Sequence, residues 1–482
     1  MFAQEFGPEF MPAAQSAAAQ ASQPATPCVP QPLLATRSLD PATGTRNLTG
    51  AAFGIGTMNE TPETSNPGTS SVPAAESPYA VLRNRNVLLY LVGRFIASMG
   101  QQMLTVAVGW ELYERTGSAL ALGLVGLNNM LPMFLFTLPA GHLADNHNRK
   151  HIILWMTSLG ALASVALAVV SLAGAPTFWI YACLFVAGTA RTFLWPSSSS
   201  FLPQLVPRRL FPRAVAWSSG SFQLSSVAGP AAGGALIALT HHAATVYLVN
   251  TFALLFCLLL VALIRYEKVW TKPEPMSLSS LVTGFKFVFA SRVIFGTITL
   301  DLFAVLLGGA TALLPVYAKD ILRVGPAGLG WLQAALPAGS LLCALLLAHR
   351  PPMQHAGRAL LWAVAGFGVA TIGFGFSRWF WLSALMLFIC GFADNISVVV
   401  RHTLVQLLTP DEKRGRVSAV NSLFIGTSNE LGGFESGLVA NWLGPVAAVV
   451  SGGVGTILVV VAVALIWPEI RRYGRLDQVV PS

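Results

Sequence analysis

The chain has 482 residues, of which 54% are hydrophobic and 10% are charged, and its formal net charge is +9 at pH 7. Soluble domains carry charge on about a quarter of their residues, so this composition excludes an ordinary soluble protein and indicates a chain that crosses a membrane many times. The basic excess does not indicate a nucleic-acid-binding protein, because Lys and Arg lie between apolar stretches rather than on one face.

Residues 1–78 are rich in Ala, Pro, Ser, Thr and Gln and show no hydrophobic periodicity. Such a segment buries too little apolar surface to offset the entropy of the chain, so we expect a disordered N-terminal tail. It lacks a basic region followed by an apolar core, so no signal peptide is predicted. The sequence leaves Met11 and Met58 open as alternative start positions.

From Val87 onward, apolar stretches recur with about the 20 residues that cross a bilayer as a helix. They predict an all-α membrane protein with twelve transmembrane helices, which we place at 87–112, 119–140, 152–173, 177–199, 214–239, 245–265, 293–317, 327–348, 359–376, 379–400, 416–440 and 445–467. No cysteines form a close pair, and four of the five fall in these stretches, so neither a disulfide nor a metal site is predicted.

Lys and Arg are concentrated in every second connection between the stretches, which predicts a cytoplasmic location for both termini. The other connections hold few basic residues: Arg115, Lys319, Arg323 and Arg378. The longest connection falls between the sixth and seventh stretches. We therefore predict an N-terminal six-helix bundle at 79–268, a cytoplasmic linker at 269–292, a C-terminal six-helix bundle at 293–468 and a cytoplasmic tail at 469–482.

An internal repeat supports this division into halves. A pattern of Gly, Pro and Arg in the region 188–238 recurs without a gap 203 residues later. The matched pairs are Gly188 and Gly391, Pro207 and Pro410, Arg213 and Arg416, Gly229 and Gly432, and Gly234 and Gly437. The repeat predicts two pseudo-symmetric halves. It also places Arg191 opposite Asp394 and, at an offset of 207 earlier in each half, Arg94 opposite Asp301.

The loop after the second stretch resembles the signature loop of the major facilitator superfamily, G-x-L-x-D-x-x-G-R-[KR]. The matching residues are Gly141, Leu143, Asp145, Arg149 and Lys150. Asn148 replaces a usual glycine, and because Asn tolerates a left-handed backbone we expect the turn to be kept. The alternative is an ordinary basic loop.

The resemblance implies that this loop gates transport. In such proteins the acidic residue contacts the N-terminus of the eleventh helix, here near Arg416, and holds the outward-facing state. The positive end of a helix dipole would attract Asp145 in the same way. The second half keeps Gly357-Arg358 but has lost the acid, so a symmetric contact is not expected.

The fifth stretch contains Ser225, Gly229, Pro230, Gly233 and Gly234, which resembles the exporter-associated motif G-x-x-x-G-P-x-x-G-G of the same superfamily. Small residues allow two helices to approach closely, and proline removes a backbone donor. The alternative is helix packing without any bearing on transport direction.

Charged residues inside the stretches are the main candidates for a translocation site. A charge at the bilayer centre costs about 2.5–3.5 kcal/mol on insertion scales, so Arg94, Arg191, Asp301 and Asp394 must pair or face water. We expect cations of the first half to face anions of the second, with Asp301 or Asp394 able to take a proton. Glu430 is a further candidate for protonation. The alternative is a static salt bridge between helices.

Further matches extend the resemblance to the branch of the superfamily that contains the enterobactin exporter and macrolide efflux proteins. They are Gly284–Phe287, Leu300–Leu302, Gly308–Gly309, Leu314–Pro315, Pro410, Arg414–Val417 and Asn421. The resemblance implies a secondary exporter of a small organic molecule in the inner membrane, working by alternating access in exchange for protons. We expect the protein to contact membrane lipid and its substrate. We expect no cofactor, no nucleic acid and no second subunit.

Other functional classes are excluded or remain open. The chain lacks G-x-x-x-x-G-K-[ST], H-E-x-x-H and G-x-S-x-G, so we predict neither an enzyme nor transport powered by ATP on this chain. Two alternatives to an exporter remain open. An uptake symporter would share the whole fold, and a non-transporting membrane sensor or scaffold is the other.

Overall fold

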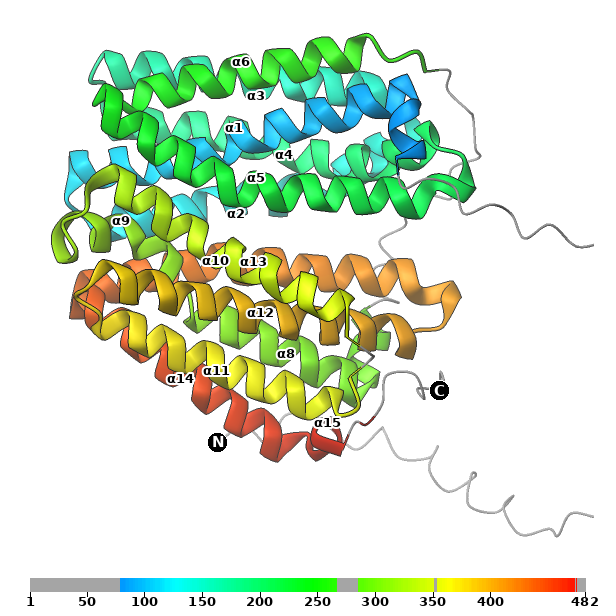
Figure 1. The fold of residues 1–482 in the computed structure, drawn as a ribbon, viewed down its shortest axis with the longest axis vertical. Coiled ribbons are helices and arrows are strands. Elements are labelled where there is room, and N and C mark those ends of the chain that lie inside the picture. The colour runs from blue at the N-terminus through cyan, green and yellow to red at the C-terminus, as the bar shows by residue number, and fades with distance from the viewer. Residues whose placement is uncertain (1–78, 267–284, 351–352, 473, 475–482) are drawn as a thin grey trace, which may run out of the picture. The chain divides into compact units, whose positions relative to one another are not determined.

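The computed structural model describes residues 79–266, 285–350, 353–472 and 474, and in these ranges the chain is almost wholly helical and contains no strand (Figure 1). The expected all-α class is therefore confirmed. The long helices are α1 (Arg85–Thr116), α2 (Ala119–Asn146), α3 (Arg149–Leu172), α4 (Thr177–Leu205), α5 (Phe211–Thr240), α6 (Ala243–Ala262), α8 (Arg292–Leu307), α10 (Gly325–Ala348), α11 (Ala356–Phe376), α12 (Phe380–Leu408), α13 (Asp411–Leu443) and α14 (Pro445–Ile466).

Helix formation follows from the apolar runs, since a helix satisfies its backbone hydrogen bonds internally and lipid offers no partners. The helices end at turn-forming residues. Gly117 closes α1 in the left-handed conformation with φ 59°, and its N–H donates to Tyr113 O. A short helix α15 (Pro468–Arg472) follows α14. The predicted tail 1–78 and most of the predicted linker lie outside the described residues.

Eleven helices of the described part are long and apolar enough to cross a membrane. The eleventh predicted helix, at 416–440, is α13, which does not meet this criterion because Asn, Ser, Thr and Glu residues interrupt its apolar sequence. It is nevertheless 33 residues long and packs against α2, α8 and α14, so it occupies the place of a spanning helix.

The seventh predicted span is broken rather than continuous. Helix α8 stops at Leu307, and η3 (Ala310–Leu313), α9 (Leu314–Val316) and η4 (Tyr317–Ile321) complete the crossing. Two glycines precede the break and Pro315, which cannot donate a backbone hydrogen bond, lies within it. A Cβ on Gly309 would lie 2.4 Å from Gly432 O, so glycine allows the chain to bend closely against α13.

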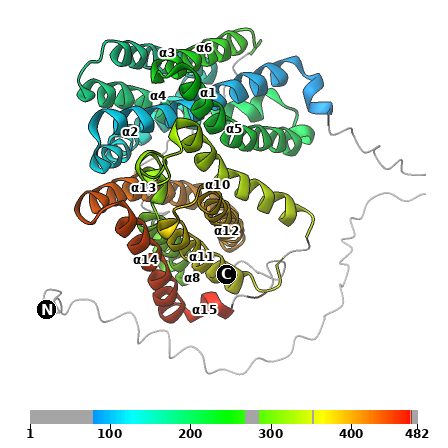
Figure 2. The same cartoon turned by 60° about the vertical axis from the view of Figure 1, so that its left-hand side comes forward.

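The helices form two bundles with equivalent packing (Figures 1 and 2). In the first half, α1 packs against α5 and α6, α3 packs against α4 and α6, and α2 packs against α4. The second half repeats each of these contacts: α8 packs against α13 and α14, α11 packs against α12 and α14, and α10 packs against α12. Between the halves, α5 packs against α10 and α2 against α13.

Helix boundaries reproduce the sequence repeat. Helices α4 and α12 are both 29 residues long, and both begin and end 203 residues apart. Helix α8 begins 207 residues after α1, which matches the offset found early in each half. The structure therefore confirms the predicted pair of pseudo-symmetric six-helix bundles.

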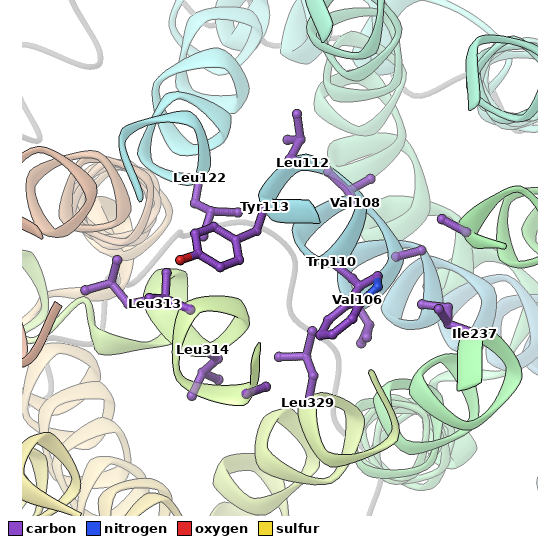
Figure 3. Close-up of a cluster of buried hydrophobic side chains, with 14 of the residues drawn as sticks. Val106, Val108, Trp110, Leu112, Tyr113, Leu122, Ile237, Leu313, Leu314 and Leu329 are labelled. Carbon is purple, nitrogen blue, oxygen red and sulfur yellow. The ribbon is translucent and has the colours of Figure 1, made fainter. Parts of the chain in front are cut away.

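The membrane domain has two ends, which differ in the turns that they carry. The loop end carries the short turns at 117–118, 241–242 and 322–324, and the linker end carries the turns at 147–148 and 206–207. At the loop end, one apolar cluster joins both halves and includes Trp110, Tyr113, Leu122, Leu313 and Leu329 (Figure 3). We call these five residues the plug.

At the linker end the apolar core is divided. One cluster there consists of residues from the first half alone, among them Tyr90, Phe201 and Leu210. A separate cluster consists of residues from the second half alone, among them Leu300 and Val417. The halves thus share a core at the loop end and have independent cores at the linker end.

Glycines make the contact between the halves possible. A Cβ on Gly234 of α5 would lie 2.4 Å from Pro326 O and 2.8 Å from Gly330 Cα of α10. A Cβ on Gly437 of α13 would lie 2.6 Å from Gly123 Cα of α2. Such distances leave no room for a side chain, so these backbones are in direct contact.

We expect Gly234→Leu to weaken the contact between α5 and α10, because overpacking costs about 1–3 kcal/mol. The measurement is thermal unfolding of the purified protein in detergent, where the variant should show a lower Tm than the unsubstituted protein. Gly220→Leu on the same helix is the matched control, since a Cβ there meets no atom within 4 Å. Equal Tm values for the two variants would contradict this account of the interface.

Candidate functional site

An ion pair between the two halves lies within the membrane domain. Arg191 Nη2 of α4 is 3.2 Å from Glu430 Oε1 of α13. The Asn129 side chain of α2 also hydrogen-bonds to the Glu430 carboxylate. The Glu430 side chain is 23% exposed, whereas that of Arg191 is 54% exposed. Glu430 thus accepts polar contacts from two helices of the other half.

The position of Glu430 is fixed by its backbone. A Cβ on Gly126 of α2 would lie 2.3 Å from Glu430 O, so α2 and α13 are in direct contact at this level. One to two turns further toward the linker end, a Cβ on Gly426 would meet the flexible tip of Met133. Still further, a Cβ on Gly141 or Gly415 would meet nothing within 4 Å. Glu430 therefore lies where the tight contact between these helices ends.

Asp301 has a different kind of partner. Its carboxylate forms an ion pair with Arg401 of α12, and the two residues are 6% and 2% exposed. Both belong to the second half. The expectation that Asp301 faces Arg94 of the first half is therefore wrong, and the static salt bridge considered as the alternative describes this residue.

Arg401 is a site residue that sequence reasoning missed. The predicted tenth span ended at residue 400, whereas α12 continues to Leu408 and so places Arg401 inside the helix. The repeat contained a usable signal, because the equivalent position in the first half is Ser198, an uncharged residue. A charge introduced into one copy of an apolar repeat needs a partner, and Asp301 is that partner.

Arg94 and Asp394 are not brought together with a charged partner. Arg94 is half-buried on α1 in the region of Tyr90 and Cys257. Asp394 is half-buried on α12, where the neighbouring Asn395 Nδ2 donates to Ser340 O at 3.0 Å. Neither Arg94 nor Asp394 makes an ion pair with any residue that the structure describes. Of the two first-half cations that were expected to face an anion of the second half, only Arg191 does so among the described residues. Its partner is Glu430 rather than Asp394.

Polar contacts also join the halves at the loop end. Tyr113 of α1 donates a hydrogen bond to Asp320 of η4, and Lys319 Nζ lies 5.7 Å from the centre of the Tyr113 ring. Figure 3 shows the Tyr113 side chain between Leu122 of α2 and Leu313 of η3. The plug is therefore sealed by apolar packing and by one hydrogen bond to a charged group.

Glu111 supports this end from within the first half. Its carboxylate accepts a hydrogen bond from Tyr247 Oη at 2.6 Å and pairs with Arg115 Nη2 at 2.5 Å. Arg115 in turn donates to the carbonyl oxygens of Ser171 and Ala175 at the end of α3. Sequence reasoning missed Glu111 and Asp320 because they lie near the ends of spans, where charges are common.

The signature loop is tied to its own half. Arg149 donates to Ala144 O and Ser200 O, and Lys150 Nζ donates to Ala262 O and Ile264 O. Asp145 and Arg416 are exposed and make no ion pair with each other. Helix α13 begins at Asp411 rather than near Arg416. The contact that the resemblance implies for Asp145 is absent from this conformation, within the described residues.

The expected left-handed backbone at Asn148 is wrong. Asn148 has φ −69° and ψ 112°, and its side chain accepts a hydrogen bond from Lys150 N at 3.0 Å. It is thus the N-cap of α3, a role in which Asn is among the preferred residues. The turn is kept by capping rather than by an unusual backbone conformation.

The motif in α5 serves two different contacts. Gly229 and Gly233 lie against Gln102 and Met103 of α1, within the first half. Pro230 O and Gly234 instead lie against Gly330 of α10, across the halves. In the second half, Gly432 lies against α8 and Gly437 against α2, so the same division of roles is repeated.

Two six-helix bundles related by a sequence repeat, joined mainly by the helix pairs α2–α13 and α5–α10 and by a charged pair, define a membrane transporter of the major facilitator type. The model of the transmembrane secretion effector family matches residues 76–479. The chain belongs to this family, which is one of transporters rather than enzymes.

Two relatives of known name are exporters. The chain is 27% identical over 394 residues to the enterobactin exporter EntS of Shigella flexneri, a match that covers 79% of this chain and 92% of the relative. It is 26% identical over 392 residues to the enterobactin exporter EntS of Escherichia coli O1:K1 / APEC, with the same coverage. The chain is therefore an integral membrane transport protein.

Solved structures support the fold. A bacterial homologue of the human lysosomal transporter Spinster, in an inward-facing and occupied conformation, matches with a TM-score of 0.64, 16% identity and coverage of 82% of this chain and 97% of that protein. The nucleoside transporter NupG matches with a TM-score of 0.63, 12% identity and coverage of 79% and 100%. At these identities the likeness concerns the fold.

We expect Arg401→Gln to lower the stability of the second half severely, because it leaves the buried Asp301 carboxylate without its partner, a loss of about 3–5 kcal/mol. Adding Asp301→Asn in the same chain removes the unpaired charge and should recover most of the lost stability. The measurement is the yield of monodisperse protein and its Tm in detergent. A single variant as stable as the unsubstituted protein would contradict a buried ion pair.

Proposed function

We propose that this protein is a secondary active exporter that moves a small organic molecule out across the inner membrane in exchange for protons. Both termini and the linker end are cytoplasmic in this proposal, as the distribution of Lys and Arg indicates. The relatives named above are enterobactin exporters, which supports efflux and makes a siderophore-like substrate the first to test. The driving force is the proton gradient, no bound cofactor takes part, and the working unit is a monomer.

The observation that supports this proposal most directly is the asymmetry between the two ends. The halves share the plug at the loop end, whereas at the linker end each half has an apolar core of its own. With the linker end in the cytoplasm, this is the conformation that accepts a substrate from inside. Rotation of the halves would close the linker end and separate the plug, which releases the substrate outside.

We expect everted membrane vesicles that contain the protein to accumulate enterobactin when a pH gradient, acid inside, is applied. A protonophore should abolish the accumulation, and vesicles from cells without the protein provide the baseline. Erythromycin, tested in parallel, separates a siderophore exporter from a macrolide pump. Accumulation in right-side-out vesicles instead would contradict export, and flux that ignores the pH gradient would contradict proton exchange.

The plug at the loop end should open more easily when Asp320, which accepts the hydrogen bond from Tyr113, is replaced. With Asp320→Ala, Tyr113 loses its partner, and a hydrogen bond to a charged group contributes about 1.5–3 kcal/mol. We expect faster labelling of Leu122→Cys, a buried plug position, by a membrane-impermeant maleimide in a cysteine-free background. Glu114→Ala on α1 is the control, because Glu114 is exposed and lies outside the plug. Equal labelling rates in the two variants would show that apolar packing alone closes this end.

A further inference from the structure

The carboxylates of the membrane domain differ in whether their partner belongs to the same half. Asp301 is held by Arg401 within the second half. Glu430 is held by Arg191 across the halves. If the halves move as bodies during transport, the first pair keeps its geometry in every state. The second pair can persist only in states that keep α4 and α13 at their present separation.

The surroundings of Glu430 leave Arg191 as its one charged contact among the described residues. Helix α2 provides Asn129, and the titratable residues of α2, His142 and Asp145, lie at its linker end. Helix α14 and η3 contain no titratable residue.

The other helices that pack against α13 provide no further charged partner for Glu430 among the described residues. Asp301 of α8 and Arg401 of α12 are engaged with each other, Arg292 of α8 pairs with Glu469, and neither Asp394 nor His402 of α12 is among the groups that act on the charge of Glu430. On α13 itself, Glu435 is within hydrogen-bond distance of Ser436 Oγ, at 3.4 Å. A change in the charge of Glu430 therefore acts on the contact between the halves through Arg191.

We propose that the Arg191–Glu430 pair holds the empty transporter in the linker-end-open state, and that a proton bound to Glu430 releases the halves. Glu430 is then the carboxyl group that couples protons to movement, and Asp301 is a structural residue. This inference rests on the proposed function, because coupling has meaning only for a proton-driven transporter. Among the candidate acids it selects Glu430, because Arg191, the ion-pair partner of Glu430, belongs to the other half and must move away when the halves separate.

The direction of the pH effect follows from the charge state. The pair exists while Glu430 is ionised, so its contribution to the linker-end-open state is complete at high pH and is lost as the pH falls through the titration of Glu430. Acidification should therefore shift the population toward the state that is closed at the linker end. In exchange transport, the pair would prevent an empty and deprotonated transporter from changing state, which would otherwise dissipate the coupling.

A distance measurement tests this without any substrate. Spin labels at His147→Cys and Gln354→Cys report on exposed positions at the linker end of each half, in a full-length chain whose five native cysteines are replaced. Pulsed electron paramagnetic resonance in lipid nanodiscs is recorded between about pH 4, near the ordinary pKa of a glutamate, and about pH 8, where an ordinary glutamate is fully ionised. We expect a shorter distance to become more populated at low pH.

Substitutions at Glu430 assign the effect. Glu430→Gln should give the low-pH distance distribution at every pH, whereas Glu430→Asp should keep a pH-dependent shift. Glu435→Gln, on the same helix and outside the ion pair, is the matched control and should behave as the unsubstituted protein. A Glu430→Gln protein that retains the full pH-dependent shift, or the absence of any shift in the unsubstituted protein, would overturn the proposal.

Transport of enterobactin in vesicles separates this inference from the proposed function. We expect Glu430→Gln to lose most of the accumulation driven by a pH gradient, at least tenfold, while exchange of labelled for unlabelled enterobactin across the membrane continues. If the unsubstituted protein transports nothing in response to a pH gradient, proton-coupled export fails. If it does and Glu430→Gln responds equally, the assignment of Glu430 fails and proton-coupled export stands.

Discussion

Direct contact between helix backbones at one end of the molecule is the constraint on which the remaining arrangement depends. In lipid, helices gain little from burying apolar side chains against one another, so close packing of small residues is a main source of attraction between them. Gly123 and Gly437 on one side, with Gly234 and Gly330 on the other, bring the halves together near the loop end. Because these contacts are short and confined to that end, they leave the linker-end cores of the two halves separate.

This geometry divides the charged residues of the membrane domain into two groups. Asp301 and Arg401 lie inside one half, where the cost of burying two charges is offset by their mutual attraction and the pair contributes to a rigid body. Arg191 and Glu430 lie between the halves, at the level where the direct backbone contact between α2 and α13 ends. A pair in that position is sensitive to the relative rotation of the halves, whereas a pair within a half is not.

The apolar plug and the polar contacts around it close the loop end, which defines one conformation of the protein. Tyr113, Leu122 and Leu313 meet at the loop end, and the Tyr113 hydroxyl reaches Asp320 of the other half. At the opposite end, Asp145 is exposed and the signature loop is held by Arg149 and Lys150 within its own half. The acid is thus available for a contact that this conformation does not contain.

The amino-acid sequence by itself determined the helical class, the approximate positions of the twelve long segments and their division into two related halves, but not the break in the seventh segment. These features depend on local composition, on the length needed to cross lipid and on an ungapped repeat, all of which are properties of the chain in one dimension. Only the tertiary structure decided which charges meet. Arg401 escaped notice because a span boundary fell one residue short of it, and Glu430 rather than Asp394 pairs with Arg191 because pairing depends on which helix faces reach across the halves. Repeat alignment relates equivalent positions in two copies, but the two copies pack through non-equivalent helices, so equivalence in sequence does not predict contact in space.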